Sequence, residues 1–181
     1  MSSKFLFIIL GNQLFPISEL EKNKNSYFFM AEDYNLCTYE KHHKHKIIFF
    51  LASMRKYAKD LENKKYFIKY YYLNKSNINL SYEDKILDFI SKKKISSVKM
   101  FEIEDKFFEK RIVNFCKKNN FEIQFLESPM FLNNRDSFTH YLSKIKKPFM
   151  ATFYKHQRIE KNILMNKDKP LGDKWSFDED N

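Results

Sequence analysis

The strongest structural signal in the sequence is an apolar stretch near its start, Phe5-Leu6-Phe7-Ile8-Ile9-Leu10, which ends at Gly11-Asn12. A continuous apolar run of this length, closed by turn-forming residues, is typical of a parallel strand that is buried on both faces. Comparable aromatic and β-branched runs predict four more strands, at residues 27–30, 66–73, 97–101 and 121–126.

The segments between these runs carry apolar residues at steps of three and four, which predicts helices. The longest such segment covers residues 39–64, and two others begin at Ser81 and Asp105, whose side chains suit the N-cap position. Strands that alternate with helices imply βαβ crossovers. We therefore predict an α/β fold for residues 1–128, a Rossmann-like three-layer domain with a mainly parallel five-stranded sheet.

The alternation of strands and helices stops after Pro129. Residues 137–145 predict a short helix and residues 150–165 a basic amphipathic one, whereas the end of the chain from Lys167 shows no core of its own. We expect residues 129–181 to form a helical extension, which either drapes over the first domain or leads into a further one.

The composition excludes several classes of protein. Hydrophobic residues make up 43% of the 181 residues, which is enough for a folded core. No apolar run approaches the ~18–20 residues of a membrane span, and no secretory signal precedes the first strand. Two cysteines, Cys37 and Cys116, are too few for a disulfide framework or a cysteine-built metal cluster. We expect a cytoplasmic protein without a membrane partner.

The net charge of +10 favours an anionic partner, although an A+T-rich genome would produce the same lysine excess.

Ligands of open parallel sheets bind beyond the carboxyl ends of the strands, where the strand order reverses. The candidate loops are residues 11–14 and 32–39, with those after Leu73 and Phe101. Neither a GxGxxG fingerprint nor a P-loop motif occurs, and a tight turn is enough to explain Gly11.

The densest polar cluster runs from Tyr39 to Lys46 and holds three histidines. On a helix, Tyr39, His43, Lys46 and Phe50 would share one side and could present a phenol, an imidazole and an ammonium to a small ligand. A solvated basic helix end explains the pattern equally well. Adjacent histidines point about 100° apart on a helix, so no metal site is expected.

No serine or cysteine has a nucleophile motif, so we assign no catalytic residue. The acidic loop of Glu102, Glu104 and Asp105 is interpreted as a helix start.

Five stretches distributed along the chain follow one family pattern. They are Ile9–Leu14, Thr38–Ile47, Ser53–Arg55, Phe153–Met165 and Gly172–Asp178. In order and spacing they resemble the prokaryotic deoxyribodipyrimidine photolyase-related proteins, a branch of the photolyase/cryptochrome superfamily. The most specific parts are the tyrosine followed by His42-His43-Lys44 and the closing Trp175-Ser176-Phe177-Asp178.

The resemblance implies a light-dependent DNA-repair flavoprotein. Members begin with such an α/β domain, which in some of them holds a lumazine-type antenna chromophore. A helical domain follows, with FAD and an iron–sulfur cluster, and there the DNA lesion is repaired by light-driven electron transfer. This chain stops where that domain would begin. We therefore expect an antenna-type N-terminal domain, as a fragment, a truncated product or a stand-alone form, that does not photorepair DNA alone.

The resemblance also implies partners. These are the FAD domain, in cis or as a separate chain, and DNA through the complete protein. Without that domain, the apolar side of the helix at residues 153–165 would be exposed and would favour homo-oligomers. Two alternatives stay open. One is a stand-alone small-molecule or nucleotide-binding Rossmann-like module, and the other is a basic nucleic-acid-binding domain that uses residues 144–161.

Carried over position by position, the family's antenna pocket implicates nine cofactor-binding residues: Gly11, Asn12, Gln13, Leu14, Leu36, Tyr39, His43, Lys46 and Phe50. Tyr39, His43 and Lys46 would hydrogen-bond the chromophore, and Phe50 would stack on it. Asn12 and Leu36 stand where the family usually has acidic residues. Phe50 stands where a smaller aliphatic residue is common, so it would narrow the cavity or add a stacking face.

Overall fold

The computed structural model describes residues 5–93 and 95–176 of the chain. It divides into two compact units, residues 1–132 and residues 133–181, which are called unit 1 and unit 2 below. The domain boundary expected from the sequence, between residues 128 and 129, lies just before this division. Within the described ranges, none of the helices has the length and hydropathy that crossing a membrane requires.

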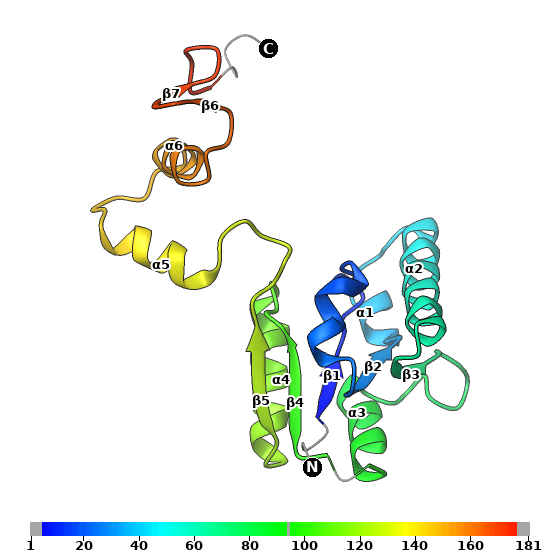
Figure 1. Cartoon of the computed structure of the whole chain (residues 1–181). Helices are drawn as coiled ribbons and strands as arrows, with labels where there is room; N and C mark the ends of the chain where they lie inside the picture. The colour runs from blue at the N-terminus through cyan, green and yellow to red at the C-terminus, as the bar shows by residue number, and fades with distance from the viewer. Residues whose placement is uncertain (1–4, 94, 177–181) are drawn as a thin grey trace. The chain divides into compact units, whose positions relative to one another are not determined.

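Unit 1 is built on a five-stranded sheet (Figure 1). Its strands are β1 (Leu6–Ile8), β2 (Tyr27–Ala31), β3 (Phe67–Tyr71), β4 (Ser97–Phe101) and β5 (Glu122–Leu126). They lie in the order β3-β2-β1-β4-β5, and every neighbouring pair is parallel. This confirms the predicted α/β, Rossmann-like architecture. Because β2 and β3 extend to one side of β1, and β4 and β5 to the other, the strand order reverses between β1 and β4.

Helices cover both faces of this sheet. On one face, α3 (Tyr82–Ser91) and α4 (Lys106–Lys118) pack Ile86 and Ile112 against Leu6 and Ile8 of β1. On the other face, α2 (Lys44–Asn63) and the 3-10 helix η1 (Ile17–Asn23) pack against Phe7. Successive residues of a strand point to opposite faces, so β1 is buried on both sides, as its continuous apolar run predicts.

The helix starts predicted at Ser81 and Asp105 are confirmed. The Ser81 side chain accepts a hydrogen bond from the Asp84 backbone N–H, and Asp84 bonds back to Ser81, which forms a capping box. The Asp105 carboxylate accepts from the backbone N–H groups of Phe107 and Phe108. Both signals involve residues close together in the sequence, and α3 and α4 begin where these residues predict.

The predicted helix at residues 39–64 is wrong at its start, because α2 begins at Lys44. The Asp33 carboxylate caps a separate short helix, α1 (Tyr34–Thr38), and the His43 Nδ1 atom accepts from the His45 backbone N–H to cap α2. Tyr39 therefore lies outside α2. It does not share a helical side with Lys46 and Phe50.

Unit 2 contains α5 (Arg135–Ser143), α6 (Met150–Glu160) and the antiparallel pair β6 (Met165–Asn166) and β7 (Lys169–Pro170). The helix predicted at residues 150–165 ends early, because Asn162 and Leu164 adopt positive φ angles and turn the chain into this hairpin.

The tail after Lys167 was expected to have no core, but it folds back onto α6. The buried Arg158 guanidinium donates to the carbonyl oxygens of Ile163, Leu164 and Trp175, and lies 5.3 Å from the Trp175 ring. Phe177 and Asp178 of the closing family motif lie outside the described residues.

Candidate functional site

The loop after β1 turns tightly at Gly11. The Gln13 backbone N–H donates to the Leu10 carbonyl over 2.9 Å, which closes the turn predicted there. A Cβ atom on Gly11 would lie 2.6 Å from Phe50 Cζ and 2.7 Å from Met54 Sδ, both on α2. A side chain at residue 11 would therefore require Phe50 and Met54 to shift, and glycine avoids this.

Glu104, in the loop after β4, joins this loop to the one after β1. Its carboxylate accepts from Asn12 Nδ2 over 3.2 Å and Gln13 Nε2 over 3.4 Å in the β1 loop, and from Ser128 Oγ over 3.3 Å. Gln13 Nε2 also donates to the Glu102 carbonyl over 2.7 Å. The two loops therefore meet where the strand order reverses, as expected of a ligand site in an open parallel sheet.

Gln13 is the least exposed of these polar residues, with 1% of its surface accessible. Its Nε2 group has the acceptors just described, whereas its Oε1 atom is buried and has no hydrogen-bond partner within the described residues. Buried polar atoms are rarely left in this state, because losing water without a replacement partner costs free energy. The reversal point therefore contains one unsatisfied acceptor.

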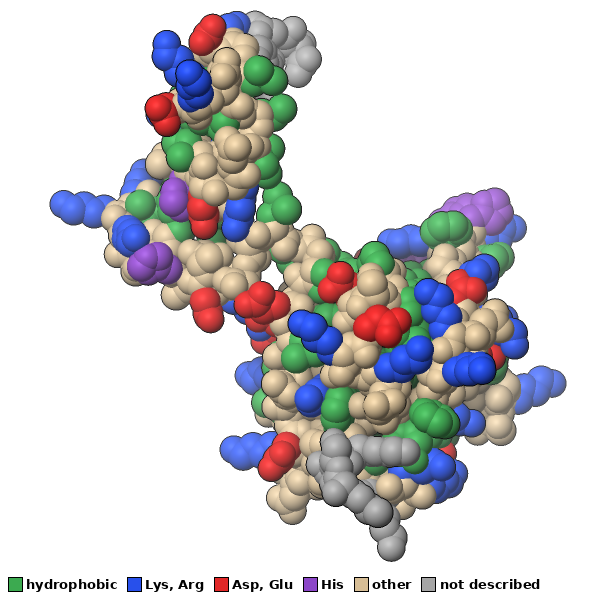
Figure 2. All heavy atoms as spheres, in the orientation of Figure 1, with side chains coloured by type: hydrophobic (Ala, Val, Ile, Leu, Met, Phe, Trp, Pro, Cys, Tyr) green, Lys and Arg blue, Asp and Glu red, His purple; other side chains and the backbone are tan. Residues whose placement is uncertain are grey.

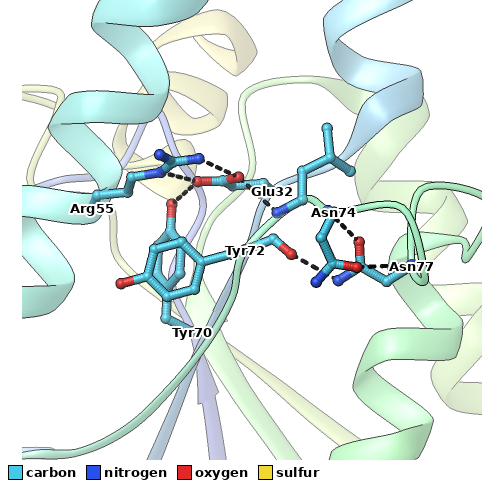
Figure 3. A network of polar contacts seen from close by, with 7 residues as sticks. Glu32, Arg55, Tyr70, Tyr72, Asn74 and Asn77 are labelled. Atoms are coloured by element: carbon cyan, nitrogen blue, oxygen red, sulfur yellow. Dashed lines mark hydrogen bonds and ion pairs between the residues drawn. The ribbon is translucent and has the colours of Figure 1, made fainter.

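A second polar network lies at the carboxyl end of β2 (Figure 3). The fully buried Glu32 carboxylate accepts from Arg55 Nε over 2.6 Å and Nη2 over 3.0 Å, from Tyr70 Oη over 2.8 Å, and from the Leu73 backbone N–H over 2.8 Å. Burial tends to raise the pKa of Glu32, but these hydrogen bonds outweigh it, so the pKa is lowered. The network fastens α2 to β2, to β3 and to the loop after β3.

On the other face of the sheet, Lys85 of α3 is fully buried and donates to the Glu32 carbonyl oxygen over 2.9 Å. Burial lowers the pKa of this ammonium group, although nearby carboxylates oppose the shift. The network and Lys85 were both missed by the sequence analysis. Lys85 sits within the apolar stripe of α3 with no sequence signal, and Arg55 entered only as part of a family stretch.

The predicted antenna residues separate into two groups. Gly11, Asn12, Gln13, Leu14 and Phe50 gather around the β1 loop, with Leu14 and Phe50 packed on the apolar cluster under α2. Leu36 and Tyr39 are 52% and 71% exposed, and His43 and Lys46 are exposed at the start of α2. A planar ring has no space over Gly11, because Phe50 and Met54 fill it. The assignment of the nine residues to a lumazine-type chromophore stays a prediction.

The cysteines give no support to nucleophilic chemistry. Cys116 is buried in the core, and burial raises its pKa to about 11. Cys37 is partly buried, and burial followed by the charges of Asp33 and Glu32 raises its pKa as well. Both thiols are thus held in the protonated, weakly reactive form.

The all-parallel sheet and the polar loops joined at its reversal point define a Rossmann-like α/β domain with a candidate ligand site. More narrowly, the chain belongs to the deoxyribodipyrimidine photo-lyase-related protein family, whose model matches residues 7–181. This confirms the resemblance seen in the sequence, and the match covers both units.

Two relatives show different extents of similarity. A (6-4) photolyase from Agrobacterium fabrum is 26% identical over 97% of this chain, but the chain spans only 35% of that protein. An uncharacterized protein, R852, from Acanthamoeba polyphaga mimivirus is 30% identical over 98% of this chain and 93% of its own length. One relative is thus much longer than this chain, and the other is of similar length.

Proposed function

We propose that this chain acts as the α/β domain of a photolyase-related, light-dependent DNA-repair flavoprotein. The observation that carries this proposal is the family match, which extends from β1 through the whole of unit 2. A helical domain, in cis or on a separate chain, would supply FAD and an iron–sulfur cluster, and the assembled protein would bind the DNA lesion. The bound flavin would supply the photochemistry, and this chain would contribute placement and contact surfaces.

The exposed apolar side chains of unit 2 support a role in contacting another domain. They include Phe149, Met150, Ile159, Leu164 and Leu171, each more than half exposed. Hydrophobic side chains are visible on the surface of this unit in Figure 2. Such surface favours burial against a partner, and a helical domain that carries FAD is the partner that the family match suggests.

One basic residue that the alternative of a nucleic-acid-binding domain would use is not accessible in the structure. Arg158 is buried, and its donors bond to backbone carbonyls, so it is not available to a phosphate. On the face in Figure 2, the Lys and Arg side chains of unit 1 are interspersed with acidic ones. The photolyase-related function therefore remains the better proposal.

The experiment is a light-dependent repair assay on material isolated from the natural host through an affinity tag on this chain. We expect the isolated material to contain FAD and to repair an oligonucleotide with one pyrimidine dimer or (6-4) lesion under blue light, but not in the dark. The recombinant 181-residue chain alone is the control and should do neither. Host material without flavin and without repair, or repair by the recombinant chain alone, would overturn the proposal.

A further inference from the structure

The sheet of unit 1 ends at β5, and the outer edge of this strand is open (Figure 1). Within the described residues, β4 is the one strand that pairs with it. The chain that leaves β5 is held toward the loop after β4, because Ser128 Oγ donates to the Glu104 carboxylate over 3.3 Å. An edge strand of this kind presents backbone N–H and C=O groups to which another strand can bind.

The backbone groups on the outer side of β5 are those of Ile123 and Phe125. The Glu122 N–H donates to the Ser96 carbonyl over 3.0 Å, so Glu122 faces the β4 side. In a parallel ladder, successive residues direct their N–H and C=O groups to opposite sides of the strand. Gln124 therefore also faces β4, whereas Ile123 and Phe125 face away from it.

We propose that β5 pairs antiparallel with β5 of a second copy of this chain, about a two-fold axis at Gln124, so that the two sheets join edge to edge. In this register Ile123 lies opposite Phe125 of the second copy, and these two residues exchange both of their backbone hydrogen bonds. The axis repeats this exchange on its other side. Gln124 lies opposite itself, at a position that needs no hydrogen bond between the strands. The pairing thus satisfies the outward-facing groups of both residues.

The apolar side chains of β5 match under the same symmetry. Ile123 and Phe125 are partly buried and pack on the apolar cluster under α3 and α4. Across the axis each of them would contact the other in the second copy, which extends this cluster from one chain into the next. Cross-strand pairs of aromatic and β-branched residues stabilise strand pairing.

The charges at the two ends of β5 also match a second copy. Lys117 and Lys118 are exposed in the last turn of α4, just before β5 begins, whereas the exposed Glu127 directly follows its end. Antiparallel pairing places the amino end of one β5 beside the carboxyl end of the other. The two lysines therefore approach Glu127 of the second copy, and opposite charges meet at both ends of the pair.

The other edge of the sheet, β3, does not favour the same pairing. Its central residue is the exposed Lys69. A two-fold axis at this position would place Lys69 opposite itself, and like charges directly opposite each other destabilise strand pairing. The corresponding residue of β5 is the uncharged Gln124, so β5 is the edge that suits a second copy.

Charges placed on the axis test the proposal by sedimentation velocity. The wild-type chain should dimerise with a dissociation constant on the order of 100 µM, because the pairing buries a small area. Gln124 is exposed, so substitutions there should leave the fold intact. Gln124→Lys and Gln124→Glu should each weaken the dimer by about fivefold or more, and an equimolar mixture of the two variants should restore it.

A wild-type chain that stays monomeric at about 1 mM would overturn the proposal. Dimers that neither substitution weakens, or a mixture that fails to restore them, would overturn it as well. Neither flavin nor DNA enters this measurement, so its result is independent of the repair assay.

Gln124→Cys supplies a second measurement, and Glu122→Cys is its matched control on the same exposed side of β5. Both are made in a Cys37→Ser background, since Cys116 is buried. The two copies of residue 124 would have Cα atoms about 4.5 Å apart, within disulfide range. The two copies of residue 122 would lie about 13 Å apart along the strands, beyond that range. Mild oxidation should therefore link Gln124→Cys into a covalent dimer and leave Glu122→Cys monomeric. Equal linking of both variants, or of neither, would overturn the proposal.

Discussion

The two polar clusters at the carboxyl edge of the sheet differ in how completely their hydrogen bonds are made. Each oxygen of the Glu32 carboxylate accepts two hydrogen bonds, from Arg55, Tyr70 and the Leu73 backbone. The Gln13 amide uses its nitrogen, while its oxygen has no partner within the described residues. A complete cluster holds elements together, whereas an incomplete one leaves a buried acceptor without a partner. The same edge thus combines a structural tie with a candidate site.

The largest expected loss of stability comes from breaking the complete cluster around Glu32. Glu32→Ala would leave the Tyr70 hydroxyl and the Leu73 N–H without acceptors and would remove the partner of Arg55, so we expect a loss of about 3 kcal/mol in unfolding free energy. The half-exposed position of Arg55 keeps the loss near the lower end of the range for buried pairs. Urea denaturation measures it. The control, Glu62→Ala, breaks an exposed pair with Lys59 and should cost about 0.5 kcal/mol or less. Equal losses of unfolding free energy in the two variants would show that Glu32 does not hold these elements together.

A smaller loss is expected where Phe50 covers Gly11. Gly11→Ala places a Cβ within 2.6 Å of Phe50 Cζ, and we expect it to destabilise unit 1 by about 1–2 kcal/mol, because flexible side chains can partly move away. In the Phe50→Ala background the loss should be clearly smaller. A double-mutant cycle by urea denaturation measures this coupling. Additive losses would mean that the two residues do not meet.

The incomplete cluster should tolerate substitution better than the complete one. Gln13→Leu removes the donor to Glu102 and Glu104, but it also removes the unpartnered Oε1, so we expect a loss of about 1 kcal/mol or less. The exposed neighbour, Asn12→Ala, is the control and should stay within about 0.5 kcal/mol of the wild type. A loss for Gln13→Leu as large as that for Glu32→Ala would remove the difference between the clusters.

The smallest expected effect is a difference between the two clusters in how their contribution to stability depends on pH. The folded-state pKa of Glu32 is lowered, so its contribution to stability is fully present above the ordinary carboxyl value of 4.5 and is lost as the pH falls through the folded-state pKa. The stability difference between the wild type and Glu32→Gln should therefore shrink as the pH falls below that ordinary value. Denaturant titrations from pH 7 down to pH 3 measure it. The corresponding difference for Gln13→Leu should change much less, because an amide does not titrate, and a parallel change in both would contradict this account.

Much of the fold could be predicted because its signals are local. The apolar runs mark all five strands of the parallel sheet, and the side chains of Ser81 and Asp105 mark two helix starts. The start of α2 was not predictable from periodicity, since residues 40–46 are all polar and carry no apolar spacing, and the His43 side chain caps the helix within them. The Arg158 contacts were also missed, because a basic residue on an amphipathic helix normally faces solvent.

The sequence alone was sufficient for the fold class and for the family, since both depend on patterns read in order along the chain. The site depended on tertiary structure. Glu104 lies 91 residues after Gln13, and the two meet only because β4 adds beside β1, where the strand order reverses. Glu32 and Arg55 also meet through tertiary packing, in their case of α2 at the carboxyl end of β2. Periodicity reports which face of an element is buried, whereas strand order decides which loops become neighbours, and this order is set by packing of the whole sheet.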